Sequence, residues 1–199
     1  MLQYAVDLAT AEGLEALTIG RVASAAGLTK AGILGHFGTK EALQIETLDA
    51  GRRAFAAAVL VPGAHDPPGL VALVALVERW IDRSSRARGG CFFASVGAEF
   101  DAKPGPVRDR VAEILGEWTD VLVARTGEAV RLGHLRRSVA SSSIVFRLYG
   151  YVLALNTRFQ LFRDERAVSE ARDAVLDLLL ESSTPAGKRQ LHRFRRAKR

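Results

Sequence analysis

The sequence predicts an all-α protein, in which an N-terminal three-helix domain of the helix-turn-helix type is joined by a fourth helix to a larger helical domain. Apolar residues recur three and four positions apart, and no stretch alternates apolar with polar residues as a strand would. Clusters of glycine and proline separate the apolar segments into about nine helices. With 199 residues, of which 48% are hydrophobic, the chain is long enough to bury a core.

The composition excludes several other classes of protein. The longest apolar runs, residues 54–61 and 70–77, have eight residues each, whereas a membrane span needs about 18. The N-terminus does not resemble a secretory signal, because it has no basic segment followed by an apolar one. The single cysteine, Cys91, excludes an internal disulfide and a cysteine-based zinc site. We therefore expect a cytoplasmic protein that contacts no membrane and holds no metal or other cofactor.

Basic charge is concentrated at the C-terminus. The formal net charge is +6, yet residues 1–50 hold three basic and six acidic side chains. The last twelve residues hold seven basic side chains and no acidic one. We interpret residues 184–199 as a disordered basic tail rather than a dedicated binding arm. Residues 51–183 then form the larger helical domain, with a break rich in proline and glycine at residues 62–69.

Residues 18–37 have the pattern of two short helices joined by a tight turn. Thr18 is placed to cap the first helix, and Gly27 can end it in a left-handed conformation. Thr29 is placed to cap the second helix, on which Ile33 and Phe37 lie four positions apart and face the core. Two such helices form the helix-turn-helix unit, whose second helix enters the major groove of DNA.

The outward face of the second helix suits close approach to DNA, because it carries small side chains and no acid. Lys30 and Lys40 lie at helix starts, where side chains and backbone amides bind phosphates. Leu34 can touch the methyl group of a thymine. The predicted DNA-binding residues are Thr18, Thr29, Lys30, Ala31, Gly32, Leu34, Gly35, His36 and Lys40.

Residues 8–43 carry a longer pattern. The chain reads AEG at residues 11–13, AAGLTK at 25–30 and HFGTKEAL at 36–43. By these motifs the segment resembles the DNA-binding domain of TetR-family transcriptional regulators, although Leu34 stands where the family often has an aromatic residue. Residues 89–111 resemble, more weakly, the C-terminal domain of a TetR subgroup. The resemblance implies a homodimeric, ligand-responsive DNA-binding regulator, most often a repressor, that binds a palindromic operator.

Two segments near the C-terminus have the spacing of a helix–helix seam. Two such helices from each of two chains would form a four-helix bundle across a two-fold axis. The spacing is equally compatible with a core inside one chain, and the family resemblance favours the dimer. The predicted interface residues are Val145, Leu148, Val152, Leu155, Phe159, Val168, Val175 and Leu178.

Large apolar side chains in the middle of the chain are candidates for a ligand pocket that takes an apolar or aromatic effector. The alternative for each of them is that it fills the core. Cys91 is interpreted as a small buried residue, with redox sensing as a minor hypothesis. The predicted pocket residues are Trp80, Cys91, Phe92, Phe93, Phe100 and Trp118.

No catalytic constellation is visible in the sequence. The four histidines are scattered, none has a carboxylate or second histidine four positions on, and no glycine-rich phosphate loop occurs. We therefore predict a ligand-responsive transcriptional regulator, and no enzyme. The competing hypothesis is a helical protein that binds small molecules or partners and has lost DNA binding, which the acidic residues 1–50 and Leu34 would favour.

Overall fold

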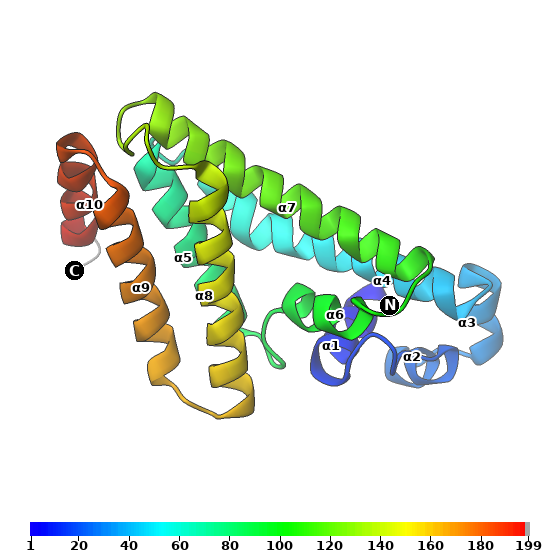
Figure 1. Cartoon of the computed structure of the whole chain (residues 1–199). Coiled ribbons are helices and arrows are strands. Elements are labelled where there is room, and N and C mark those ends of the chain that lie inside the picture. Colours follow the sequence, from blue (N-terminus) through cyan, green and yellow to red (C-terminus); the bar gives the residue numbers. More distant parts are fainter. Residues whose placement is uncertain (198–199) are drawn as a thin grey trace. The chain divides into compact units, whose positions relative to one another are not determined.

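The computed structural model describes residues 1–197, and the regular secondary structure in this range is helical (Figure 1). Its only β-type pairing is an isolated antiparallel bridge between Leu135 and Ser183, again within the described range. The all-α prediction is therefore confirmed. The chain divides into two compact units, of which unit 1 comprises Met1–Ala57 with Arg86–Gly116, and unit 2 comprises Ala58–Ser85 with the chain from Glu117 onward.

Unit 1 begins with four consecutive helices. These are α1 (Leu2–Glu12), α2 (Ile19–Ala26), α3 (Lys30–Phe37) and α4 (Lys40–Phe55), and the unit is completed by α6 (Phe92–Phe100) and the first part of α7 (Pro106–Arg131). Thr18, Thr29 and Thr39 cap α2, α3 and α4, since each threonine hydroxyl accepts a hydrogen bond from the backbone N–H three residues on. The caps predicted at Thr18 and Thr29 are confirmed.

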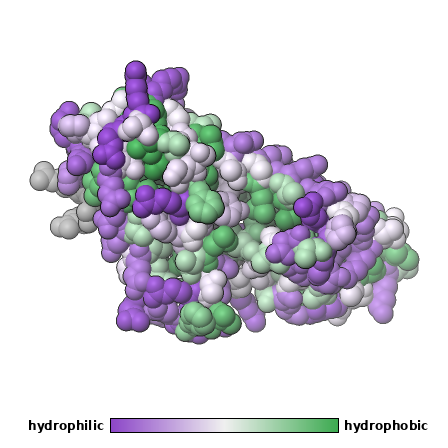
Figure 2. All heavy atoms as spheres, viewed as in Figure 1, coloured by the Kyte–Doolittle hydropathy of each residue, from purple (hydrophilic) through white to green (hydrophobic). Residues whose placement is uncertain are grey.

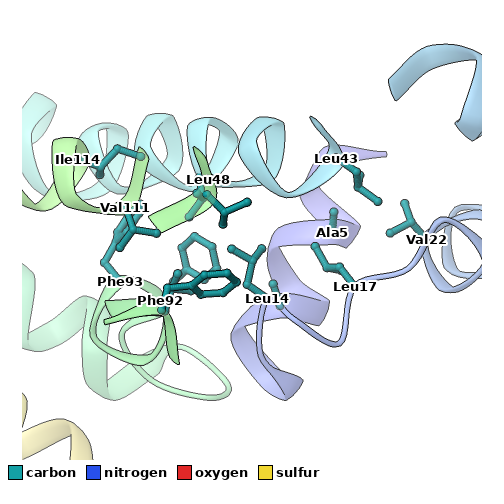
Figure 3. Packing of buried hydrophobic residues seen from close by; sticks show 14 of the residues in the cluster. Ala5, Leu14, Leu17, Val22, Leu43, Leu48, Phe92, Phe93, Val111 and Ile114 are labelled. Carbon is teal, nitrogen blue, oxygen red and sulfur yellow. The ribbon is translucent and has the colours of Figure 1, made fainter. Parts of the chain in front are cut away.

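An apolar core holds unit 1 together, and α6 and α7 contribute to it alongside the first four helices (Figure 3). The labelled side chains come from α1 and the loop after it, from α2 and α4, and from α6 and α7: Ala5, Leu14, Leu17, Val22, Leu43, Leu48, Phe92, Phe93, Val111 and Ile114. The sequence-based boundary at residue 50 therefore needs correction. Residues 86–116 pack with the N-terminal helices, because the aromatic start of α6 is buried in their core.

Polar contacts fix α6 and α7 to the same helices. Glu99 of α6 accepts the backbone N–H of Leu14 at 2.8 Å through Oε2 and that of Glu15 at 2.7 Å through Oε1. Arg110 of α7 donates its Nε–H to Oδ1 of Asp49 on α4 at 2.9 Å. One carboxylate thus satisfies two backbone donors that α1 and the following loop leave without helical partners.

Unit 2 begins where α4 runs on into a π-helical turn, η1 (Ala56–Leu60), and a short 3-10 turn, η2 (Val61–Gly63). Its helices are α5 (Leu70–Arg86), the rest of α7, α8 (Ser141–Leu161), α9 (Arg166–Ser182) and α10 (Pro185–Ala197). Helices α8 and α9 run antiparallel beside each other (Figure 1). In the core of the unit the Trp80 ring meets the Trp118 ring edge-on at 5.0 Å and the Tyr149 ring at 5.4 Å between centroids.

The predicted disordered tail is wrong for residues 185–197, which form α10. Leu191 is fully buried, so the helix gains apolar packing that the charge pattern alone conceals. Thr184 begins the helix, since its carbonyl accepts the Lys188 N–H at 2.9 Å and its hydroxyl accepts the Gly187 N–H at 3.2 Å. Residues 198 and 199 of the predicted tail lie outside the described residues.

Candidate nucleic-acid interface

Gly27 and Thr29 form the turn between α2 and α3. Gly27 has a φ of 65°, a left-handed value that costs glycine little, and it ends α2. The N–H of Leu28 then donates to the Ala23 carbonyl at 2.9 Å, which closes the turn. Thr29 follows at once and caps α3 through the N–H of Gly32 at 3.0 Å. These contacts set the direction of α3 relative to α2 within unit 1.

Helix α3 buries one side and leaves the other open. Ile33 is fully buried and Phe37 nearly so, whereas Leu34 keeps 51% of its surface exposed. A Cβ atom at Gly35 would meet nothing within 4 Å, so this face can approach another molecule closely. The exposed residues of the helix are Lys30, Ala31, Gly32, Leu34, Gly35 and His36. All six residues of the DNA-binding prediction that lie on α3 are therefore exposed, on the part of the helix that Ile33 and Phe37 leave open.

The starts of α2 and α3 hold the predicted DNA contacts Thr18, Thr29 and Lys30. Thr18 and Thr29 are exposed at the N-termini of α2 and α3. Lys30 lies over α2, where a Cβ atom at Gly20 would come within 2.9 Å of Lys30 Cε. Leu28, in the turn, is also exposed, by 51%, and the DNA-binding prediction did not include it because the spacing pattern described helices and not the residue between them.

Lys40 has an internal role in addition to its predicted one. Its Nζ donates to the Glu15 carbonyl oxygen at 2.8 Å and lies 3.4 Å from the Glu15 carboxylate, while Lys103 lies 3.5 Å from the other carboxylate oxygen. Burial raises the pKa of Glu15, but the hydrogen bonds and charges of Lys40 and Lys103 outweigh it, so that pKa lies below its ordinary value. Lys40 therefore fixes the loop before α2 to the start of α4.

Unit 2 contains a cavity of about 240 Å³ that is bordered by residues of the η1–η2 segment. Arg79 closes one side of it, since its Nε donates to the Val59 carbonyl at 2.8 Å and its NH2 group lies 2.8 Å from Oδ2 of Asp66. The cavity is lined by Leu60, Gly63, Asp66, Ala72, Leu76, Arg79, Val121 and Arg125. Two arginines and one aspartate thus line the cavity together with apolar side chains.

None of the six predicted pocket residues lines this cavity. Cys91, Phe92, Phe93 and Phe100 belong to the core of unit 1, while Trp80 and Trp118 lie in the core of unit 2. Each is at least nine-tenths buried, as the core-filling alternative expects. Size and apolarity mark core residues and pocket residues alike, so the assignment of these six residues to a ligand pocket stays a prediction.

Two family models match the chain. The model for bacterial regulatory proteins of the tetR family matches residues 2–47, and the model for the tetracyclin repressor-like C-terminal domain matches residues 69–175, more than half of the chain. The chain belongs to the TetR family. The resemblance inferred from the sequence is thereby confirmed, as is the expectation of a DNA-binding transcriptional regulator rather than an enzyme.

Solved structures of other proteins share the fold, among them a TetR-family transcriptional regulator. A regulator from Cytophaga hutchinsonii is similar with a TM-score of 0.79 at 17% identity, and 92% of each chain is covered. A regulator from Saccharomonospora viridis in complex with choline has a TM-score of 0.76 at 20% identity, covering 90% of this chain and 93% of that one. AibR, in complex with isovaleryl coenzyme A and operator DNA, has a TM-score of 0.70 at 22% identity, with 90% and 94% covered. No curated protein matches the chain in sequence.

The predicted dimer seam of this TetR-family chain is largely occupied within one copy. Val145, Leu148, Val152 and Leu155 of α8 are buried in the single chain, as are Val175 and Leu178 of α9, while Phe159 and Val168 are half-buried. The six buried residues belong to the core of unit 2, as the alternative interpretation of the seam expects, while the interface role of Phe159 and Val168 stays a prediction. A regular apolar spacing shows that a helix face is buried, and does not show by what.

A different face of α8 is apolar and exposed. Phe146 is exposed by 81%, Leu161 by 71% and Leu153 by 41%, and Phe162 directly follows the helix. Figure 2 shows apolar surface emerging among polar side chains over this helix. Beside it, small side chains of α8 and α9 leave a shallow hollow of about 160 Å³, bordered by Ala154, Ala167, Ala171, Ala174, Arg158 and Glu170 among others.

Two absences complete the description of the site. Within residues 1–197, no group of three or more histidine, cysteine or acidic side chains is arranged to hold a metal ion. In the same range, no helix is both long and apolar enough to cross a membrane.

Proposed function

We propose that this TetR-family regulator reads its operator by placing α3 in the major groove, with Leu34, Gly35 and the neighbouring exposed residues against the bases. The observation that carries this proposal is the exposed, acid-free face of α3 beside two buried anchors, Ile33 and Phe37. Lys30 and the capped helix starts at Thr18 and Thr29 are suited to phosphate contacts. Specificity then depends on apolar contact and close backbone approach more than on charge.

A footprint of the purified protein on the DNA upstream of its own gene tests this function. A protected palindrome with half-sites about 34 Å apart, or a multiple of that spacing, is expected. The competing function, a helical binding protein without operator recognition, predicts no sequence preference on this DNA or on a pool of random duplexes. Residues 1–50 carry more acidic than basic side chains, and this is the reason for testing the competing function.

We infer that the active form is a homodimer that uses the exposed face of α8, rather than the buried seam. Three large apolar side chains, Phe146, Leu153 and Leu161, are too exposed for a face that stays in water, and exposed apolar patches mark interaction sites. A two-fold dimer presents two α3 helices to a palindrome, which fits repression at an operator. Sedimentation of the wild-type protein should give twice the mass of the chain.

The cavity beside Arg79 is the proposed effector site. Its apolar walls and the two guanidinium groups of Arg79 and Arg125 suit a small molecule with an apolar body and one acidic group. At about 240 Å³ it is smaller than typical ligand pockets, which run from about 300 to 1,000 Å³, so a small effector is expected. The complexes of the relatives with choline and with isovaleryl coenzyme A support the general role of this domain in ligand binding.

The effector acts by preferring one conformation. An acid that competes with Asp66 for Arg79 loosens the η1–η2 segment, which continues directly from α4. A ligand shifts the equilibrium only by its differential affinity for the two states. The effector class is tested by adding short carboxylic acids to the protein–operator complex and measuring the release of DNA, for the wild type and for Arg125→Gln.

Because transcription takes place at the chromosome, we place the protein in the bacterial cytoplasm.

A further inference from the structure

Helix α10 carries a strongly basic surface that operator reading by α3 does not use. Lys188, Arg189, His192 and Arg193 are all exposed. Between residues 185 and 197 the sequence contains no acidic side chain. Among the residues that the structure describes, no acidic side chain forms an ion pair with Lys188, Arg189 or Arg193, whereas Arg79, Arg147, Arg158 and Arg172 of the same unit are all paired. The charge of α10 is therefore available to a partner outside the chain.

The apolar side of α10 is already occupied. Leu191 is fully buried, and Gly187 packs so closely that a Cβ atom there would lie 2.1 Å from the His134 carbonyl oxygen. A helix that lies on a membrane must bury its own apolar face in lipid. Because α10 buries this face in unit 2, its outward surface offers charge without an apolar anchor.

Hydrogen bonds hold the start of α10 in a fixed position. The Thr184 hydroxyl donates to the Gly133 carbonyl at 2.6 Å, and the Thr184 N–H donates to the His134 carbonyl at 3.0 Å. The side-chain amide of Gln190 lies 3.0 Å from Nε2 of His134. The helix is thus fastened at two successive turns to the loop between α7 and α8.

The same loop adds two arginines to the basic surface. The Arg136 N–H donates to the Ser182 carbonyl at 2.9 Å, and Leu135 forms an antiparallel bridge with Ser183. Arg136 and Arg137, both exposed, therefore lie close to the start of α10. We define the basic ridge as Arg136, Arg137, Lys188, Arg189, His192 and Arg193.

We propose that the basic ridge binds the phosphate backbone of double-stranded DNA without reading its sequence, as a second DNA contact of this chain. Unit 1 has ten basic and ten acidic side chains, so its formal net charge is zero and it has little long-range attraction for DNA. The entire net charge of +6 lies in unit 2, where the last twelve residues hold seven basic side chains. A rigid array of cations releases the counterions of DNA, which makes non-specific binding favourable and dependent on salt.

The test is the affinity of the full-length protein for a fluorescent duplex of random sequence, measured by anisotropy over a series of salt concentrations. Arg189→Gln combined with Arg193→Gln removes two charges, one helical turn apart, from exposed positions. Arg163→Gln combined with Arg166→Gln removes two exposed arginines from the same unit and serves as the matched control. The first variant should lose about tenfold in affinity at low salt and about two units of the slope of log affinity against log salt. The control should change neither quantity, and both variants should keep the helical circular dichroism signal of the wild type.

Two results would overturn the proposal: an unchanged salt slope in the first variant, or loss of binding to vesicles of anionic lipid with duplex binding intact. Arg136→Gln combined with Arg137→Gln should act in the same direction as the α10 variant if the ridge is one surface. Failure of the proposed function gives a different pattern, since the wild type would then bind operator and random duplexes equally while the ridge variant still lost affinity.

Discussion

The face of α3 and the basic ridge of α10 contrast in almost every physical property. The α3 face contains Leu34, glycines and one lysine on a unit whose formal charges cancel. The ridge contains arginines and a lysine on the unit that carries all of the net charge. Under the two proposals, α3 contributes shape complementarity to DNA and the basic ridge contributes electrostatic attraction, so the two contributions come from separate elements. A net basic charge therefore does not identify the element that reads sequence.

The largest expected effect comes from a charge placed on the α3 face. Leu34→Glu sets a carboxylate against DNA, and such like-charge contacts cost several kcal/mol, so operator affinity should fall by about a thousandfold. Leu132→Glu is the matched control, because Leu132 is exposed by 46% but lies in unit 2. Operator binding is measured by anisotropy. Equal losses in the two variants would show that α3 has no special role.

The next effect concerns the exposed face of α8. Phe146→Glu should convert the dimer into a monomer and lower operator affinity by about a hundredfold, because the two α3 helices no longer bind as one unit. Sedimentation measures the mass and anisotropy the affinity. Val123→Glu, at a smaller exposed apolar residue on α7, is the control. A dimer that persists in Phe146→Glu would place the interface elsewhere, while binding through the basic ridge should survive in either case.

An intermediate effect is expected where α6 holds the loop before α2. Glu99→Gln replaces a carboxylate that accepts two backbone N–H groups, and the free energy of unfolding should fall by about 1–3 kcal/mol. Denaturant titration measures the change. Asp101→Asn removes the same charge from an exposed position two residues further along the chain, and it should leave the stability nearly unchanged. An equally stable Glu99→Gln protein would show that these hydrogen bonds do not hold the DNA-binding helices.

The smallest effect concerns the ion pairs of α8 and α9. Hydrogen bonds from Arg158 lower the pKa values of Asp164 and Glu170, and Arg166 contributes to the first of these. A lowered carboxyl pKa stabilises the fold above the ordinary pKa, and this contribution is lost as the pH falls through the lowered value. Arg158→Gln should therefore reduce the unfolding midpoint slightly at neutral pH, and the difference should vanish in acid and in high salt. Thermal unfolding across a pH series measures it, and a difference that grows in acid would contradict this account.

Much of unit 1 could be predicted from the sequence because its signals are local. Threonine caps, the left-handed Gly27 and the spacing of Ile33 and Phe37 act within a few residues, and all of them appear in the structure. The attachment of α6 could not be predicted in this way. Glu99 meets Leu14 and Glu15 across more than eighty residues of chain, and no local pattern links them.

The sequence by itself determined the helical class, the helix-turn-helix and its outward face, since each follows from periodicity and capping within short segments. Only the tertiary structure decided which apolar faces remain free: the regular seam of α8 is buried inside the chain, and Phe146 and Leu153 are left exposed. It also turned residues 185–197 from a tail into a helix, because Leu191 finds a buried site on unit 2. The reason is the same in both cases. A sequence records that a residue is apolar or charged, whereas the neighbour that covers it is set by contacts between distant segments.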